Sequence, residues 1–199
     1  MTRTFRLGLA AASLAALTTT ASAQWQAAEQ VEHYAISGKS GIELYQSIGE
    51  NGPKAGIGRA IAFTDFKLLW SRDYRPQPDG SCVLATARPS LTITYRLPKP
   101  RGDLPEPVRT NWKTFIDGVT AHEKVHGEMI VDLVKAIEAT SIGLSAPNDP
   151  GCQKVRAELQ SRLGPLSQAQ RARSRDFDRA ELSEGGNVHQ LVLNLANGG

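Results

Sequence analysis

The strongest constraint on the fold of this chain is a change of hydrophobic period at residues 98–107, PKPRGDLPEP. Before this proline-rich segment, apolar residues alternate with polar ones, which is typical of half-buried β-strands. After it, apolar residues recur every three or four positions, which is typical of amphipathic helices. The sequence therefore predicts a sheet half at residues 31–97, a helical half at residues 107–184 and a C-terminal tail at residues 185–199.

In the sheet half, two runs of apolar residues with a common parity surround the turn sequence RPQPDG at residues 75–80. We expect these two strands to pair antiparallel, with the following residues on the apolar parity: Phe66, Leu68, Trp70 and Tyr74, then Leu91, Ile93, Tyr95 and Leu97. HYAISG at residues 33–38 predicts a further short strand. A helix should follow, because Ser40 and Glu43 have the spacing of a capping box.

The helical half predicts two long helices joined by the loop GLSAPNDPG. The first runs from Pro107 to about Ser141, and the second begins near Cys152, with Gly164-Pro165 expected to kink or split it. A short loop between long helices favours an antiparallel hairpin. The predicted fold class is α+β, a small antiparallel sheet packed against a long two-helix hairpin, in one domain at residues 24–199.

The first 23 residues have the pattern of a secretory signal peptide. Arg3 and Arg6 precede an apolar run, and Ala21-Ser22-Ala23 forms the expected cleavage site. Removing residues 1–23 takes away two arginines and no acids, so the formal charge falls from +3 to +1. We therefore expect a periplasmic or secreted protein that binds neither nucleic acid nor, after cleavage, the membrane.

The only cysteines are Cys82 and Cys152. In an exported chain, two cysteines predict one disulfide, which would attach the loop between the long helices to a strand. Two buried free thiols are the alternative.

The segment HEKVH contains two of the four histidines of the chain, His122 and His126, with Glu123 between them. Residues four apart on a helix lie about 40° apart around its axis, so both imidazoles can reach one metal ion. This is the H-E-x-x-H arrangement, in which the glutamate accepts a proton from a zinc-activated water. Two packed core histidines beside a solvated acid, or a structural zinc site, are the alternatives.

Zinc requires a third protein ligand. Asp132 occupies the position of the third ligand in the longer H-E-x-x-H-x-x-G-x-x-H pattern, but Met129 replaces the glycine that turns the chain. An uninterrupted helix carries Asp132 about 9 Å along the axis from His126, too far to bind the same ion. The second helix returns beside the motif, and its end offers three candidates, in order of preference: Asp178, Glu184 and His189.

The mature chain resembles a bacterial family of predicted secreted zinc-dependent proteases, a domain of unknown function. The matching segments, over roughly residues 33–184, are YAISGKSGIELYQSI with GP after it, WSRDYRPQPDGSCVL, the later LP, Trp112 and Phe115 before HEKVH, and the pair Phe177-Asp178. The resemblance implies zinc hydrolase chemistry, and with the H-E-x-x-H motif it makes the predicted fold zincin-like. Family members tend to continue with Thr-x-His-Gly, whereas this chain has RAELSEGG, with Glu184-Gly185 as the nearest equivalent.

These observations predict an exported zinc metallopeptidase with Zn²⁺ bound by His122, His126 and Asp178, and with Glu123 as general base. Its partner would be a peptide or protein substrate lying extended along an exposed strand edge. Tyr74 or His189 would donate a hydrogen bond to the developing oxyanion. The alternative is a non-catalytic envelope binding protein with a degenerate metal site, suggested by the missing family histidine.

Overall fold

The structure is a computed structural model that describes residues 25–56 and 58–198. The signal peptide predicted at residues 1–23 lies outside the described residues. The elements follow in this order: β1 (Ala28–Ile36), α1 (Gly41–Asn51), β2 (Lys54–Ala55), β3 (Gly58–Arg59), β4 (Phe63–Pro76), β5 (Cys82–Pro100), α2 (Val108–Ser141), β6 (Ser145–Ala146), α3 (Gln153–Leu182) and α4 (Asn187–Asn197).

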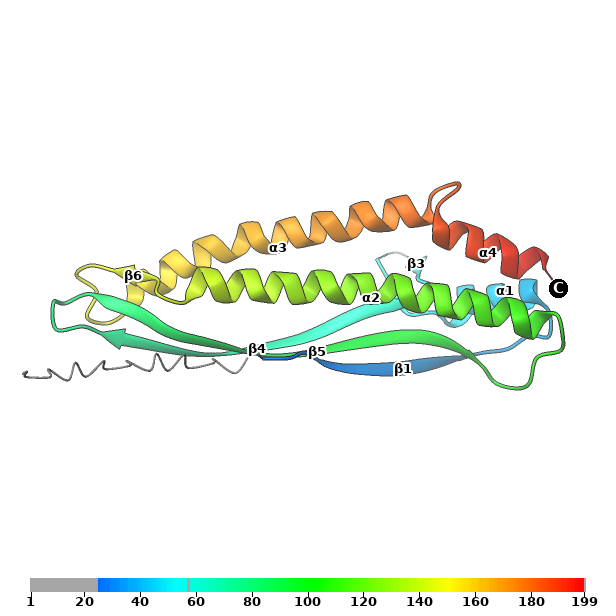
Figure 1. Cartoon of the computed structure of the whole chain (residues 1–199), viewed down its shortest axis with the longest axis horizontal. Coiled ribbons are helices and arrows are strands. Elements are labelled where there is room, and N and C mark those ends of the chain that lie inside the picture. The colour runs from blue at the N-terminus through cyan, green and yellow to red at the C-terminus, as the bar shows by residue number, and fades with distance from the viewer. Residues whose placement is uncertain (1–24, 57, 199) are drawn as a thin grey trace, which may run out of the picture.

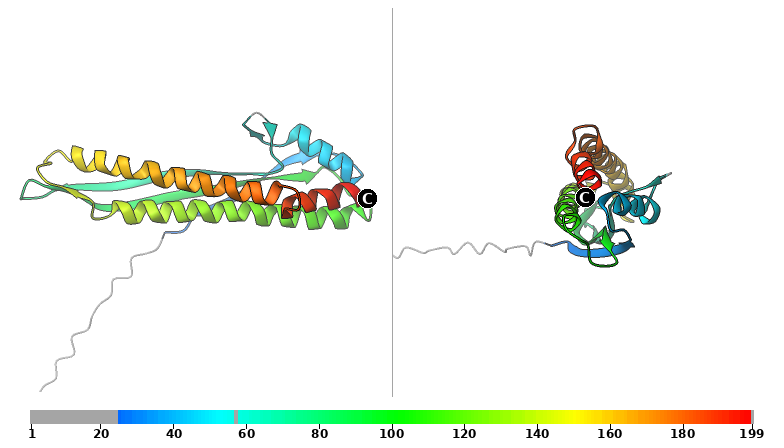
Figure 2. Two further views of the ribbon diagram at one scale, coloured as in Figure 1. Left: turned by 90° about the horizontal axis from the view of Figure 1, so that it is seen from above. Right: turned by 90° about the vertical axis from the view of Figure 1, so that its right-hand side faces the viewer.

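The molecule is elongated, with the long strands β4 and β5 on one side, α2 along them and α3 along α2 (Figure 1). Viewed end-on, α1 and α4 gather at the end of the molecule where α2 begins (Figure 2). The α+β class is confirmed, as are the two long antiparallel helices. Within the described residues, no helix is both long enough and apolar enough to cross a bilayer.

The sheet is mixed, which corrects the prediction of an antiparallel sheet. β4 and β5 pair antiparallel from Phe63↔Arg96 to Pro76↔Cys82, but β1 pairs parallel with β5. The reason is the connection after β1: α1 and the short strands β2 and β3 keep the chain at one end of the sheet. β4 therefore runs back along the sheet, and β5 returns in the direction of β1. Alternating parity is the same in both directions, so the sequence pattern alone did not reveal it.

The predicted capping box at the start of α1 is confirmed, because the Ser40 side chain accepts from the Glu43 amide and the Glu43 side chain from the Ser40 amide. The main core lies between the sheet and α2, where the inward residues of β5 meet the apolar face of the helix. Its most buried members include Ile93, Tyr95, Phe115, Val119 and Val134. This core fixes the face of α2 that also carries the histidines, since both belong to one helical stripe.

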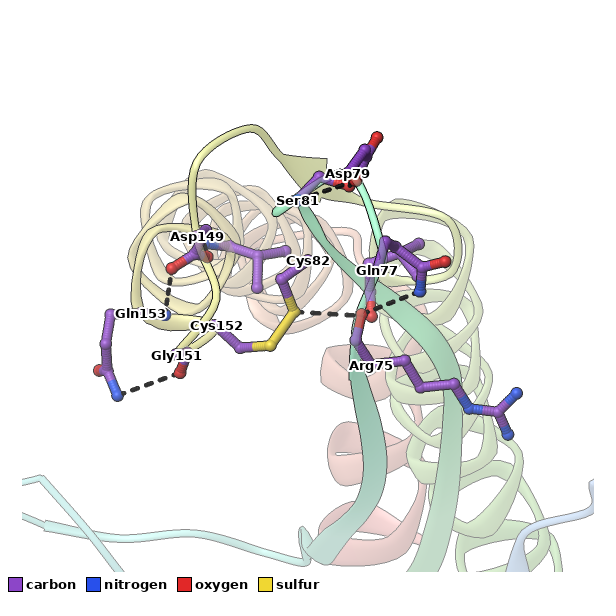
Figure 3. The surroundings of a disulfide bond; sticks show 11 residues. Arg75, Gln77, Asp79, Ser81, Cys82, Asp149, Gly151, Cys152 and Gln153 are labelled. Atoms are coloured by element: carbon purple, nitrogen blue, oxygen red, sulfur yellow. Dashed lines mark hydrogen bonds between the residues drawn. A yellow bond between two sulfur atoms is a disulfide. The ribbon is translucent and has the colours of Figure 1, made fainter.

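Cys82 and Cys152 form a disulfide that joins the start of β5 to the residue before α3 (Figure 3). The disulfide prediction is thus confirmed, and it excludes the alternative of free thiols. The Asp149 carboxylate accepts hydrogen bonds from the amides of Gln153 at 2.7 Å and Val155 at 3.0 Å, which caps the first turn of α3. A second, smaller core surrounds this junction: Leu84, Leu144, Ala146, Val155 and Leu159.

α3 is one continuous helix, so Gly164-Pro165 does not split it. Pro165 is exposed, and so is Ser161, the residue whose carbonyl loses its intrahelical partner. The C-terminal residues assigned to a tail instead form α4, which buries Val188 and Leu195. α4 approaches α1 so closely that a Cβ on Gly41 would lie 1.7 Å from the Leu195 carbonyl oxygen.

Candidate metal centre

The central part of α2 holds the two histidines and the glutamate of the H-E-x-x-H motif. His122, Glu123 and His126 are all buried. The Nε2 atoms of the two imidazoles are 3.1 Å apart, because a spacing of four places both rings on one face of the helix. The two imidazoles therefore present their Nε2 atoms to one point.

Asp178 of α3 approaches the same point from the opposite side. Its Oδ1 lies 2.8 Å from Nε2 of His126 and 3.3 Å from Nε2 of His122. Among the described residues, His122, His126 and Asp178 are the group of side chains able to hold a metal ion, with ligand atoms within 4.8 Å of one another. The antiparallel return of α3 thus brings the preferred candidate to the histidine pair.

The structure does not bring the other candidates to this group. Glu184 is exposed after the end of α3, and His189 lies on α4, where its Nδ1 accepts from the Gly185 amide at 3.3 Å. Asp132, which helix geometry excludes, forms an ion pair with Arg173 at 2.9 Å on the surface.

The remaining ring nitrogens of the histidines face other residues of α3. Nδ1 of His126 lies 2.9 Å from the Ser174 hydroxyl oxygen. Nδ1 of His122 is buried without a hydrogen-bond partner among the described residues, and Glu181 Oε2 is 3.8 Å away. Ser174, Asp178 and Glu181 are spaced by four and three residues, so they share one face of α3. Sequence reasoning missed Ser174 and Glu181. Their spacing from Asp178, four residues before it and three after it, is the signal that could have identified them.

Contacts around the group shift the affinity of its members for protons. Burial raises the pKa of Asp178, but hydrogen bonds with both imidazoles outweigh it and hold that pKa well below its usual range. Burial lowers the pKa of His126, but the hydrogen bond and charge of Asp178 outweigh burial and raise it. Without an ion, the negative charge of Asp178 therefore stabilises the protonated form of His126.

Glu123 is 5% exposed, so it is a buried group and not a solvated acid. The Thr64 hydroxyl donates to its Oε2 at 2.5 Å, which holds the carboxylate in place from β4. Burial is the largest influence on this group and raises the pKa of Glu123, while Thr64 and the two histidines act in the opposite direction. A buried carboxylate with increased proton affinity suits a general base.

Gly127, the residue after His126, allows α2 to approach the sheet at this point. A Cβ there would lie 2.2 Å from the phenol oxygen of Tyr95, which donates to Glu29 Oε1 at 3.0 Å. A side chain at position 127 would therefore collide with Tyr95 in its present position. The contact between Gly127 and Tyr95 therefore limits the distance between this turn of α2 and β5.

A cavity of about 820 Å³ adjoins the histidines and Asp178, between α2, α3 and the chain at residues 59–66. Phe66 and Leu182 are exposed in its walls, and Tyr45 of α1 also lines it. Tyr74 does not: it packs beside the disulfide core with Arg156 3.7 Å over its ring. Tyr45 is therefore the tyrosine that lines this cavity in the described part of the chain, and sequence reasoning missed it because α1 lies far away along the chain.

Comparisons with curated proteins and with solved structures find no match to this chain. Residues 31–186, which include the whole histidine and aspartate group but not His189, match a family described as bacterial protein of unknown function (DUF922). Since the match covers well over half of the sequence, the chain belongs to the DUF922 family of bacterial proteins.

Proposed function

We propose that this protein is an exported zinc-dependent peptidase. The observation that carries the proposal is the convergence of His122, His126 and Asp178 on one point, with the buried carboxylate of Glu123 in the same cavity. The domain would then be zincin-like in the sense that an H-E-x-x-H helix supplies two ligands and the base.

The donor set fits zinc. Two imidazole nitrogens and one carboxylate oxygen are ligands of catalytic zinc sites, which keep a further position open. Ligand atoms about 2.0–2.2 Å from a tetrahedral zinc lie roughly 3.3–3.6 Å apart. The three atoms here are 2.8–3.3 Å apart, so a small opening of the side chains accommodates the ion.

The outer contacts also fit this chemistry. A ligating imidazole normally uses its second nitrogen to donate to a neighbour, which fixes its tautomer and orientation. Ser174 is in position to accept from Nδ1 of His126, and Glu181 is the nearest acceptor for Nδ1 of His122. One face of α3 thus supplies the third ligand together with support for both histidines.

A zinc ion in this position would polarise a substrate carbonyl and lower the pKa of an attacking water towards about 7. Glu123 accepts the proton of that water and passes it to the leaving amine of the cleaved peptide. Thr64 holds Oε2 of Glu123, so that its other oxygen is available for the proton. The exposed apolar side chains of Phe66 and Leu182 offer contact surface for a peptide in the cavity.

Two features support export. A disulfide persists in oxidising compartments such as the periplasm, and the N-terminal sequence has the pattern of a signal peptide. We therefore place the proposed activity in the periplasm or outside the cell.

The missing family histidine favours a second candidate, a non-catalytic envelope binding protein. RAELSEGG replaces the family's Thr-x-His-Gly, and its Glu184 is exposed away from the histidines. In that case Glu123→Gln would leave partner binding and any cellular phenotype unchanged.

The test uses the mature chain, residues 24–199. We expect stoichiometric zinc by mass spectrometry of the purified protein, and its loss in Asp178→Ala. Zinc-loaded protein should cleave a peptide library, and Glu123→Gln should abolish cleavage while retaining zinc. Glu128→Gln is the matched control, because Glu128 is exposed on the same helix. The proposal is refuted if the purified protein retains no zinc and Glu123→Gln does not reduce peptide cleavage.

A further inference from the structure

α3 carries six arginines, and four of them have a partner within the protein. Three of these form an ion pair with a carboxylate, and one stacks on an aromatic ring: Arg162 with Glu158, Arg173 with Asp132, Arg179 with Asp176, and Arg156 over Tyr74. Intramolecular pairing is therefore the rule for an arginine on this helix.

Arg171 and Arg175 are the exceptions. Neither has an ion pair or hydrogen-bond partner in the described part of the chain, and both line the cavity beside the metal centre. Four residues apart, they share one face of α3, where two like charges destabilise a helix. The two unpartnered cations thus line the cavity that would hold a ligand.

Among the described residues, each carboxylate that lines the cavity already has a partner. Asp65 faces Arg96 at 3.7 Å, Glu123 accepts from Thr64, and Asp178 contacts both histidines. Arg59, a third cation of the cavity, already donates to the Gly52 carbonyl at 2.6 Å. Arg171 and Arg175 are exposed, so their charges are accessible to a ligand in the cavity that they line.

We propose that Arg171 and Arg175 bind a carboxylate of the substrate, and so make this site selective for acidic peptides. The inference rests on the proposed peptidase function and names its substrate class. Guanidinium groups bind carboxylates through two parallel hydrogen bonds, which gives both affinity and orientation.

The spacing along α3 places this carboxylate relative to the cleaved bond. Arg175 and Arg171 precede Asp178 by three and seven residues, which corresponds to about 4.5 Å and 10.5 Å along the helix axis. An extended peptide advances about 3.3 Å per residue. The acidic group therefore lies one to three residues from the carbonyl held at the metal centre.

Two kinds of peptide carboxylate satisfy this chemistry, an internal Asp or Glu side chain and a C-terminal carboxylate. The experiment uses zinc-loaded Glu123→Gln protein and three pools of randomised octapeptides. One pool has an internal Glu and an amidated C-terminus, the second replaces Glu by Gln, and the third has Gln and a free C-terminus. Mass spectrometry measures which peptides the protein retains.

We expect retention of the Glu pool, the free C-terminus pool or both to exceed that of the amidated Gln pool. The double variant R171Q/R175Q should reduce that preference roughly tenfold, the size expected for a charge-assisted hydrogen bond. Arg173→Gln is the matched control, since Arg173 lies between the two on α3 but pairs with Asp132. R171K/R175K keeps the charge and should restore only part of the preference.

Equal retention of all three pools, including no retention of any, overturns the inference, as does a preference that R171Q/R175Q leaves unchanged. Failure of the peptidase function is a separate result: wild type would cleave no peptide, whereas carboxylate-dependent retention by the zinc-loaded Glu123→Gln protein would persist. Cleavage by wild type without an acidic preference would leave the peptidase and remove only the carboxylate site.

Discussion

Removing the Ser174 hydroxyl tests whether α3 supports the metal centre as well as supplying Asp178. Ser174 Oγ lies 2.9 Å from Nδ1 of His126, and it is the hydrogen-bond partner that the structure gives this nitrogen. Loss of such an outer contact weakens metal binding about 10–100-fold. We therefore expect Ser174→Ala to raise the zinc dissociation constant by about that factor.

The same change has a calculable effect on stability. Zinc at about 1,000 times its dissociation constant stabilises the folded state by about 4.1 kcal/mol, and at 100 times by about 2.7 kcal/mol. A tenfold weaker site thus loses about 1.4 kcal/mol of stabilisation at fixed zinc. For a chain of this size, that lowers the zinc-dependent rise in melting temperature by roughly 3–6 °C.

The assay is a melting curve of the mature protein with zinc and with a chelator, alongside zinc competition to obtain the dissociation constant. Ser167→Ala is the control, because it makes the same substitution on α3 away from the cavity. Nitrogen NMR of the zinc-loaded protein should show a change in the tautomer of His126 in Ser174→Ala but not in Ser167→Ala. Equal dissociation constants for the two variants would refute the role of Ser174.

Burial raises the pKa of Glu123, so the folded metal-free protein binds this proton more tightly than the unfolded chain. The resulting stabilisation is present at low pH and is lost as the pH rises through the folded-state pKa. Urea unfolding at pH 5 and pH 8 should therefore show a smaller loss of stability in Glu123→Gln than in wild type. Gly127→Ala should destabilise the protein by about 1–3 kcal/mol, because the new Cβ meets the Tyr95 phenol. Replacing Cys82 and Cys152 by serine should cost about 4 kcal/mol, the chain-entropy value for a loop with a sequence separation of 70.

Each of these has its own control. Glu128→Gln, on the exposed face of α2, should leave the pH dependence unaltered. Gly49→Ala should be neutral or stabilising, because no atom lies within 4 Å of the added Cβ on α1. Reduced wild type should unfold at the same urea concentration as the serine double variant. A large difference between them would mean that loop entropy does not account for the stability lost in the double variant.

Patterns within short segments gave correct predictions of the local structure. The switch of period at residues 98–107 separated the strands from α2, and the capping box of Ser40 and Glu43 began α1. These predictions succeed because period and capping depend on neighbours within one or two turns of the chain. The direction of β1 and the existence of α4 were beyond such reasoning, since both depend on where distant segments return.

The spacing of His122 and His126 is enough to predict that they share one helix face, because residues four apart do so in any α-helix. The three-dimensional fold selects the third member from the three candidates, two acids and one histidine. Asp178 does so because α3 runs antiparallel to α2 in a register fixed by the loop before it and by the disulfide, whereas Glu184 and His189 lie beyond the end of that helix. The burial of Glu123 beneath Thr64 was likewise decided in three dimensions, because proton affinity depends on surroundings that the chain assembles only when β4 folds against α2.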